Sequence, residues 1–500
     1  MTKFMSQVTR NSASAKKPSS IANWKTKFTT PQILRWGLYL VWGVSLLALG
    51  TANEAVKMQR DAIETIGKNT APSVLTAQRI KDSLADLDAN AANELLVKPG
   101  ENPEAVKEYR KRQEKLSKLL ALAAENITEG DAERQQIRTL ILSLGDYMTQ
   151  IERARLANER GDSRSLLEAY RKAANILDSI LLPAAEQLQN VNLESLDRAY
   201  ISQKARSANL LFLAVIGNLL PLVMLGLLQL FLYHRMRRNL NPYLLGATLC
   251  AIVLFFYITN ALNAASYHLK VAKEDAFNSL LPLRQARALA YSANADESRY
   301  LLDREFAAQH ERKFVEKMAK IAVIPANLLD FESVAKEFKP SNVQGVAGFT
   351  GLFAQEFANI TFGGEREAAV EMLSAFGVYV NIDKQIRSLV NSDKKAEAIA
   401  LCTGNKQGQS NWAFTQFLKK HNDVTDINLT AFTENLDRGF KSVGYVPDKS
   451  QQSSDDILQG AMLDRSFKNT YQFEMWSLAL ISAIAILTFF GLNLRLKEYS

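Results

Sequence analysis

The sequence contains few of the residues from which cross-links, metal centres and catalytic sites are built. Among its 500 residues there are two cysteines and four histidines. Cys250 lies in a hydrophobic segment and Cys402 in a polar region, so we expect no disulfide framework. The histidines have no metal-binding spacing, and we find neither a phosphate-binding loop nor a dinucleotide fingerprint. We therefore expect no enzyme activity, no metal and no cofactor.

Charged residues are missing from four apolar segments. These are residues 36–52, 207–233, 239–267 and 475–494, and none of them contains Asp, Glu, Lys or Arg. The two central segments each exceed the roughly 20 residues that a helix needs to cross a bilayer. We therefore predict four transmembrane helices. Transport coupled to ions or protons usually requires ionisable groups along the path, so the composition of these segments argues against a transporter.

Acidic residues are also missing from the first 35 residues, which carry several lysines and arginines. A second basic stretch is the turn 234–238 between the central segments, and a third is the tail 495–500. Short basic loops stay in the cytoplasm. We therefore predict a multi-pass protein of the bacterial inner membrane with both termini and the turn inside. Residues 53–206 and 268–474 then lie on the outer face.

The basic stretches allow further roles. Binding of anionic lipid or of a cytoplasmic partner is the alternative to a purely topological role for residues 1–35. Nucleic acid is not expected, because no aromatic and basic fold signature accompanies the charge. We interpret Arg235, Arg237 and Arg238 as a docking element for a cytoplasmic partner. Small residues at the end of segment 36–52 imitate a signal-peptidase site, but we favour a retained anchor over cleavage.

Residues 53–206 have the apolar periodicity of four amphipathic helices. Asn102 before Pro103 predicts an N-cap, and Asp162 is expected to cap the next helix but one. That last helix has a heptad seam formed by Leu166, Tyr170, Ala173, Leu177, Ile180 and Ala184. Pro183 implies a kink in it. We predict a four-helix bundle for this region.

Residues 268–474 begin in the same way, which indicates an internal duplication. An Ala- and Leu-rich helix follows Pro72 in the first region and Pro282 in the second, and Tyr147–Asp162 is echoed by Tyr379–Asp393. The predicted fold class is therefore all-α. It comprises four transmembrane helices with two extracytoplasmic, four-helix-bundle-like domains in tandem.

The second region carries extra material. Residues 320–366 are rich in phenylalanine, and residues 403–450 are polar around Trp412. One interpretation is an elaborated core with loops. The alternative is a ligand or partner surface formed by Phe349, Phe353, Phe357 and Trp412. A final helix should start near residues 454–456, where acids follow a serine cap, and continue into the last span.

The tandem order of span, bundle and span, and the helix from Pro282 to Leu302 in particular, resembles the four-helix-bundle sensor domains of methyl-accepting chemoreceptors and sensor kinases. Those receptors carry a cytoplasmic signalling domain, whereas here only a few residues follow the last apolar segment. The layout is also similar to the GlnX-type membrane component of actinobacterial amino-acid sensing. That resemblance implies a receptor that links an extracytoplasmic solute-binding protein to a separate cytoplasmic kinase.

We predict a non-enzymatic bacterial membrane sensor or signal-transducing adaptor. Its partners would be membrane lipids, a cytoplasmic kinase or other output protein, and an extracytoplasmic solute-binding protein. A structural or assembly protein of the cell envelope and a transporter-accessory protein are the alternatives. We also expect the two halves to form a pseudodimer within one chain, with a homodimer as the alternative.

Overall fold

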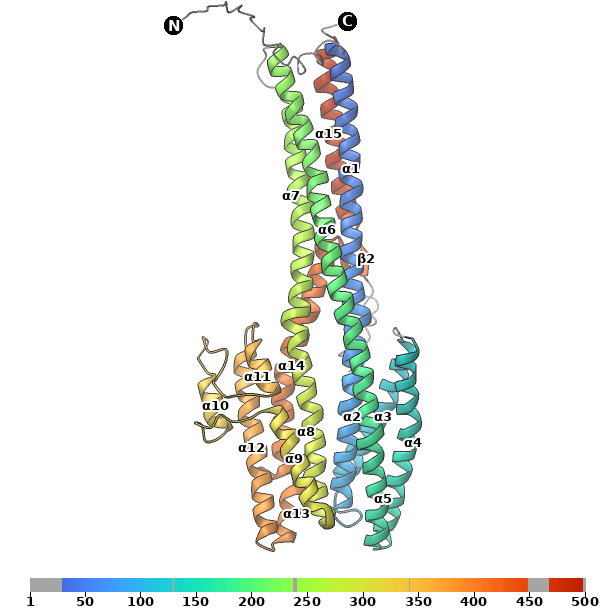
Figure 1. The fold of residues 1–500 in the computed structure, drawn as a ribbon, viewed down its shortest axis with the longest axis vertical. Helices are drawn as coiled ribbons and strands as arrows, with labels where there is room; N and C mark the ends of the chain where they lie inside the picture. The colour runs from blue at the N-terminus through green and yellow to red at the C-terminus, as the bar shows by residue number, and fades with distance from the viewer. Residues whose placement is uncertain (1–28, 128–129, 237–240, 341, 448–466, 498–500) are drawn as a thin grey trace, which may run out of the picture. The chain divides into compact units, whose positions relative to one another are not determined.

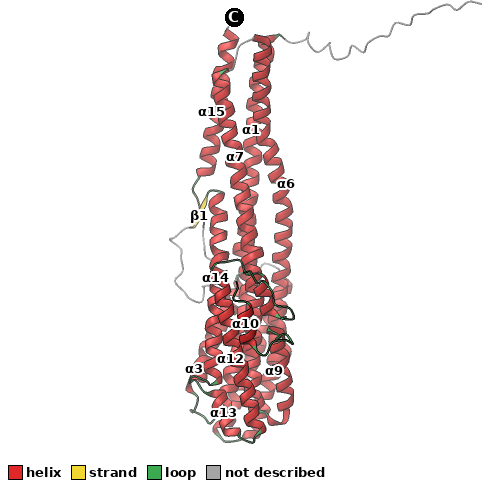
Figure 2. Ribbon diagram, turned by 90° about the vertical axis from the view of Figure 1, so that its left-hand side faces the viewer, coloured by secondary structure: helices red, strands yellow, loops and turns green. Residues whose placement is uncertain are grey.

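The computed structural model describes residues 29–127, 130–236, 241–340, 342–447 and 467–497. Helices make up 86% of the structure, so the predicted all-α fold class is confirmed. Among these residues one short pair of strands is the exception (Figure 2). The fold is thus an arrangement of helices in which packing between helices supplies almost all of the stability.

Contacts divide the chain into two compact units. The first comprises Met1–Ala52, Leu213–Tyr257 and Met475–Ser500, and the second comprises Asn53–Phe212 and Ile258–Glu474. The apolar segments lie in helices α1 (Thr30–Glu64), α6 (Leu182–Met236), α7 (Pro242–Lys270) and α15 (Gln472–Leu496). By length and composition, the described residues contain four helices able to cross a membrane, as predicted.

In the first unit, polar side chains bond to backbone carbonyls of neighbouring helices. The Trp42 indole of α1 donates to the carbonyl of Ala485 in α15 at 3.3 Å. The Asn241 amide, just before α7, donates to the carbonyl of Gly491 in α15 at 2.8 Å. Such bonds add modest strength between helices in an apolar environment.

The second unit begins with the helices predicted for residues 53–206. They are α2 (Ala71–Leu95), α3 (Pro103–Glu125), α4 (Asp131–Glu159), α5 (Ser163–Ile176) and the first part of α6. Both predicted caps are confirmed, since Asn102 accepts a bond from the amide of Ala105 at 3.2 Å and Asp162 accepts one from Ser165 at 3.0 Å. These short-range signals therefore set the helix starts.

One member of the predicted heptad seam does not face the core. Ile180 is 40% exposed, whereas its neighbour Leu181 is fully buried. The reason is a π-helical turn, η3 (Leu177–Leu181), between α5 and α6. A π turn holds one extra residue, so it rotates the following side chains and places Leu181 where the heptad predicted Ile180.

Three helices that contain or continue from apolar segments have such a turn close before a proline. The turns are η2 (Thr65–Thr70), η3 and η4 (Val271–Phe277), and the prolines are Pro72, Pro183 and Pro282. A proline donates no amide hydrogen and crowds the carbonyl four residues earlier. For Pro72 and Pro183 that carbonyl lies inside the wide turn, which gives it room, so at Pro183 the irregularity that we predicted takes the form of a π turn.

The remainder of the second unit starts at α8 (Asn278–Leu302). It continues through η5 (Arg304–Phe306), α9 (Ala307–Ile321), α10 (Phe331–Glu337), α11 (Leu352–Ala358), α12 (Glu365–Asn391), α13 (Lys395–Thr403) and α14 (Ser410–Ser442). The long helix α14 was not expected in the polar stretch 403–450. Its phenylalanines explain it, because Phe414, Phe417 and Phe432 recur on one face and are buried.

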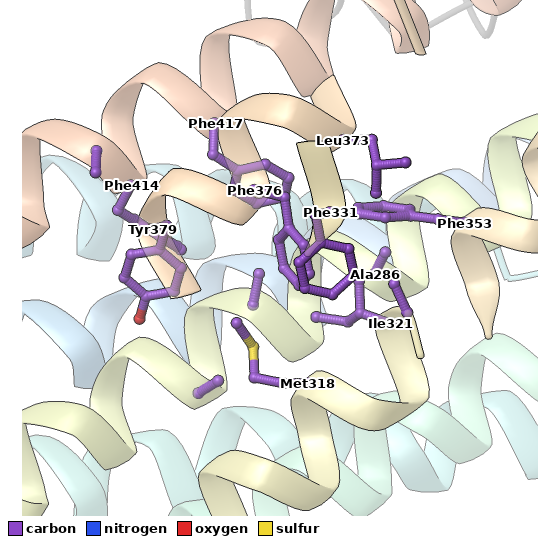
Figure 3. Close-up of a cluster of buried hydrophobic side chains, with 14 of the residues drawn as sticks. Ala286, Met318, Ile321, Phe331, Phe353, Leu373, Phe376, Tyr379, Phe414 and Phe417 are labelled. Atoms are coloured by element: carbon purple, nitrogen blue, oxygen red, sulfur yellow. The ribbon is translucent and has the colours of Figure 1, made fainter. Parts of the chain in front are cut away.

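The phenylalanine-rich segment forms a core rather than a surface. Phe353 and Phe357 are fully buried, and Phe349 is 7% exposed. Phe357 stacks on Phe338 with ring centroids 4.0 Å apart. Phe353 meets Phe376 edge-on at 5.2 Å (Figure 3). This corrects the alternative that assigned Phe349, Phe353 and Phe357 to a ligand surface, because burying these rings between α10, α11 and α12 stabilises the insertion.

The last helix starts later than we predicted. Residues 454–456, where it was expected to start, lie outside the described residues. Strand β2 (Phe467–Asn469) pairs antiparallel with β1 (Tyr445–Pro447), and α15 begins at Gln472. The helix therefore does not run through residues 467–469 into the final apolar segment. Phe467 stacks on Phe440 of α14 at 3.8 Å, which fixes the strand against the end of that helix.

Candidate functional site

Helices α2 and α8 pack side by side and run in the same direction within the second unit (Figure 1). Arg284 in the first half of α8 lies 3.7 Å from the carboxylate of Asp82 at the middle of α2, and near the ends of both helices Ser298 donates to Asn93 at 3.1 Å. Almost every residue of α2 is buried, including all three of its aspartates. This contact, which we call the α2/α8 seam, is therefore both buried and polar.

A buried ionic cluster occupies one side of the seam. The guanidinium of Arg299, with 1% of its side chain exposed, donates to Asp88 at 2.7 Å and to Asp296 at 3.1 Å. It also donates to Asp178 of the π turn η3 at 3.3 Å and to the hydroxyl of Tyr170 at 3.1 Å. We call these five residues the Arg299 cluster. It joins α2, α5, η3 and α8 through one side chain.

Cations from α9 complete the charge balance of the cluster. Lys313 donates to Asp178 at 2.8 Å, and Lys317 donates to Asp296. Three carboxylates thus face one guanidinium and two ammonium groups. Burial raises the pKa of Asp88 against the opposing effect of Arg299. Burial would lower the pKa of Arg299, but the carboxylates around it raise that pKa well above the usual value.

A cavity lies on the other side of the seam. Its volume is about 780 Å³, and α2, α3, α8 and α14 form its walls. Asparagines dominate the lining, among them Asn90, Asn93, Asn294, Asn405, Asn411 and Asn422. Three rings, those of Tyr291, Trp412 and Phe414, also line it. We call this space the amide-lined cavity, and its size is typical of pockets that hold small molecules.

The two arginines of this cavity already have partners. Arg112 lies 2.5 Å from Asp86, and Arg287 donates to Asn422 and, at 3.3 Å, to the hydroxyl of Tyr291. Burial raises the pKa of Asp86, and it raises the pKa of Tyr291 to about 12. The walls therefore present amides and rings as well as compensated charges.

A buried carboxyl group lies next to the amides. Ser410 donates to Glu297 at 2.6 Å, and the thiol of Cys402 donates to the same oxygen at 3.4 Å. Burial, with the nearby charge of Asp383, raises the pKa of Glu297 to about 8. At neutral pH this carboxyl group is mainly protonated, which avoids adding an unpaired charge to the buried charges of the seam.

The residues that the sequence singled out do not form one site. Trp412 lines the amide-lined cavity and also a second cavity of about 710 Å³ between α12 and α14. The phenylalanines lie in the core described above. Arg235 is exposed in the last turn of α6, whereas Arg237 and Arg238 lie outside the described residues.

Sequence reasoning missed the Arg299 cluster. A signal for it exists, because Asp82, Asp86 and Asp88 occur in a helix that is otherwise rich in alanine and leucine. Such a helix is buried on most sides, and acids in it require partners. The identity of those partners is not encoded locally, since Asp88 and Arg299 are 211 residues apart.

The α2 side of the seam lies in a recognisable domain. Residues 62–201 match the family model of the actinobacterial sensor domain. The match contains Asp88, Tyr170 and Asp178 but ends well before Arg299. No curated protein and no solved structure matches the chain. Together with the four apolar helices, the match indicates a membrane sensor. This agrees with the sequence prediction of a membrane sensor.

Proposed function

We propose that the chain is a bacterial inner-membrane sensor that detects a stimulus on the outer face and signals through a separate cytoplasmic protein. The observation that carries the proposal is the continuity of α6. This single helix contains the end of the sensor-domain match, at residue 201, and all of the apolar segment 207–233. A displacement of its first part is therefore transmitted along an unbroken backbone.

The two helices of the α2/α8 seam also continue into apolar helices. Helix α1 continues through η2 into α2, and helix α7 continues through η4 into α8, which carries Arg299. A stimulus that binds differently to two arrangements of the α2/α8 seam shifts the balance between them. Because each side of the seam continues into an apolar helix, that shift alters the membrane helices relative to one another.

The output would be read at the cytoplasmic ends of these helices. Arg235 is the one arginine of the basic stretch 234–238 that lies in the described residues, and we propose that Arg235, Arg237 and Arg238 dock an output protein such as a kinase. An extracytoplasmic solute-binding protein is the proposed carrier of the stimulus. A fixed assembly role in the envelope would require the same outer surfaces but no change of state, so dependence on a stimulus separates the two functions.

Topology is tested first. Reporter fusions at residues 130 and 400 should score as exported, because the basic stretches hold the termini and the turn inside. A cytoplasmic score at either position contradicts the proposal.

The output is tested by affinity purification of the tagged full chain from native membranes. A cytoplasmic kinase or other regulatory protein should co-purify, and changing Arg235, Arg237 and Arg238 together to Gln should reduce its yield at unchanged membrane insertion. Changing Arg304, an exposed residue of η5, to Gln is the control. Recovery of envelope structural proteins alone, with no effect of the arginine changes, would favour the assembly role.

A further inference from the structure

A buried tyrosine bonds to a polar side chain at equivalent positions in the two halves of the second unit. In the first half Tyr147 of α4 donates to Asp88 of α2 at 3.1 Å, and in the second half Asn294 of α8 donates to Tyr379 of α12 at 3.4 Å. Asp88 comes seven residues before Leu95, as Asn294 comes seven before Leu301. These spacings place Asp88 and Asn294 at equivalent positions of α2 and α8.

An arginine extends the correspondence. Arg155 comes eight residues after Tyr147, and Arg387 comes eight after Tyr379. The Arg155 guanidinium donates to Glu94 of α2 at 2.8 Å, and that of Arg387 lies 4.6 Å from the ring centre of Tyr300 in α8, so each arginine contacts the seam helix of its own half. The pair α2 and α4 therefore corresponds to the pair α8 and α12, which gives the seam two related sides.

The two sides hold different side chains at equivalent positions. Counted from Asp88 and Asn294, position two is Asn90 in α2 and Asp296 in α8, and position five is Asn93 in α2 and Arg299 in α8. On one side of the seam Arg299 bonds to Asp88 and Asp296, so its side chain occupies the volume between α2 and α8 there. On the other side the three equivalent residues are all asparagines, and the amide-lined cavity lies there.

We propose that the amide-lined cavity is the stimulus-binding site and that it takes a small, uncharged, hydroxylated solute of the carbohydrate class. This inference rests on the proposed sensor function. Asparagine amides combine donors and acceptors, which suits hydroxyl groups that do both. Some of these amides also bond within the protein, as Asn90 does to Asp86 and Asn294 to Tyr379. In both cases the amide nitrogen is the donor, so the amide oxygen can accept from a ligand. Trp412, Tyr291 and Phe414 supply apolar ring surface for the C–H faces of a sugar.

The charges around the cavity favour a neutral ligand over an ion. Asp86, Glu104 and Glu108 balance Arg112, Arg287 and Lys419 on the walls. The two arginines are also held by Asp86, Asn422 and Tyr291, so a charged ligand would have to displace these bonds. An uncharged polar ligand keeps them and bonds to the amides instead.

Trp412 provides the measurement. It is the one tryptophan in the second unit, because the other four are Trp24, Trp36, Trp42 and Trp476. Replacing those four by Phe in the full chain, purified in lipid nanodiscs, leaves Trp412 as the reporter. Titration with glucose, galactose, mannose, arabinose, maltose and sucrose should change its emission saturably for at least one sugar. Glutamine, glutamate and arginine should give no saturable change.

Two variants locate the binding. Asn405 is exposed at the cavity, and Asn405→Phe should weaken binding at least tenfold by narrowing the entrance without altering the core. Asn294→Leu removes a lining amide and should weaken it similarly. The control is Asn391→Phe at the exposed end of α12, which should bind as before.

Failure of this inference is distinct from failure of the proposed function. Absence of a response to every sugar, a response to an amino acid instead, or equal binding by the Asn405 and Asn391 variants overturns the cavity assignment. Sugar binding that is lost in Asn405→Phe, but that never alters recovery of the cytoplasmic partner from native membranes, supports the site and overturns the sensor function.

Discussion

Replacing Arg299 by Met should destabilise the second unit more than any change at an exposed arginine. The variant removes the guanidinium and leaves Asp88, Asp296 and Asp178 in place. Lys313 and Lys317 still compensate Asp178 and Asp296. Asp88, however, loses its ion pair with Arg299, which is its one ion pair among the described residues. Its carboxylate, which is fully buried, keeps only the hydroxyl groups of tyrosines.

The expected cost follows from the burial of the pair. Removing one partner of a buried ion pair typically costs about 3–5 kcal/mol, because the remaining charge stays uncompensated. Replacing both partners by neutral groups costs much less. The double variant Asp88→Asn with Arg299→Met should therefore be more stable than Arg299→Met alone. Asparagine is also the residue that the other side of the seam has at this position.

Thermal unfolding in nanodiscs, followed by circular dichroism and by Trp412 fluorescence, provides the assay. Arg304→Met is the matched control, because Arg304 is exposed and such changes usually alter stability by no more than about 0.5 kcal/mol. An Arg299→Met protein as stable as wild type would refute the reasoning. A double variant no more stable than the single one would refute it equally, because the penalty would then not come from an unpaired Asp88.

Three further changes test other parts of the structure. Glu297→Gln should leave stability nearly unchanged at pH 5 but raise it above wild type at pH 8.5, which melting curves at these two pH values would reveal. The reason is that the pKa of Glu297 rises on folding from 4.5 to about 8, so the wild-type protein loses up to about 1.4 kcal/mol of stability per pH unit between pH 4.5 and pH 8. Phe357→Ala should cost about 3–5 kcal/mol as a fully buried ring is lost, whereas Leu329→Ala, at a side chain 94% exposed, should cost almost nothing; equal melting temperatures would contradict the core assignment. Gly351→Ala should destabilise by about 1–3 kcal/mol or more, since φ is +103° and a Cβ would lie 2.7 Å from the carbonyl oxygen of Ile321; limited proteolysis of the insertion would detect the loosening, and an unchanged pattern would count against it.

Signals within a few residues of one another were read correctly from the sequence. The apolar segments and the caps at Asn102 and Asp162 depend on composition and on bonds spanning three residues. The π turn that exposes Ile180 was not foreseen. Spacings of three and four residues are both allowed in a helix, so the shift from Ile180 to Leu181 that one inserted residue causes still fits the apolar pattern.

Features that depend on distant parts of the chain could not be read in this way. Helix α14 contains many residues of low helix propensity, and its packing through Phe414 and Phe417 outweighs that preference. The Arg299 cluster joins residues from α2, η3 and α8, and the pairing of Asp88 with Arg299 has no local signal. The three aspartates of α2 are a signal for buried acids that our sequence prediction did not use, and they do not identify the cation that meets them.

The π turns have a mechanical consequence of their own. Each is an insertion defect of one residue in a helix, and such a defect can change place without any change in the number of residues. If η2 or η4 moved by one turn toward the apolar end, the residues it passed would rotate by about 100° and shift by about 1.5 Å along the axis, while the helix beyond stayed in register. The helices on both sides of the seam carry such a defect between their apolar and their buried parts. They can therefore convert a small sliding motion into rotation of a short segment, at a cost confined to a few hydrogen bonds.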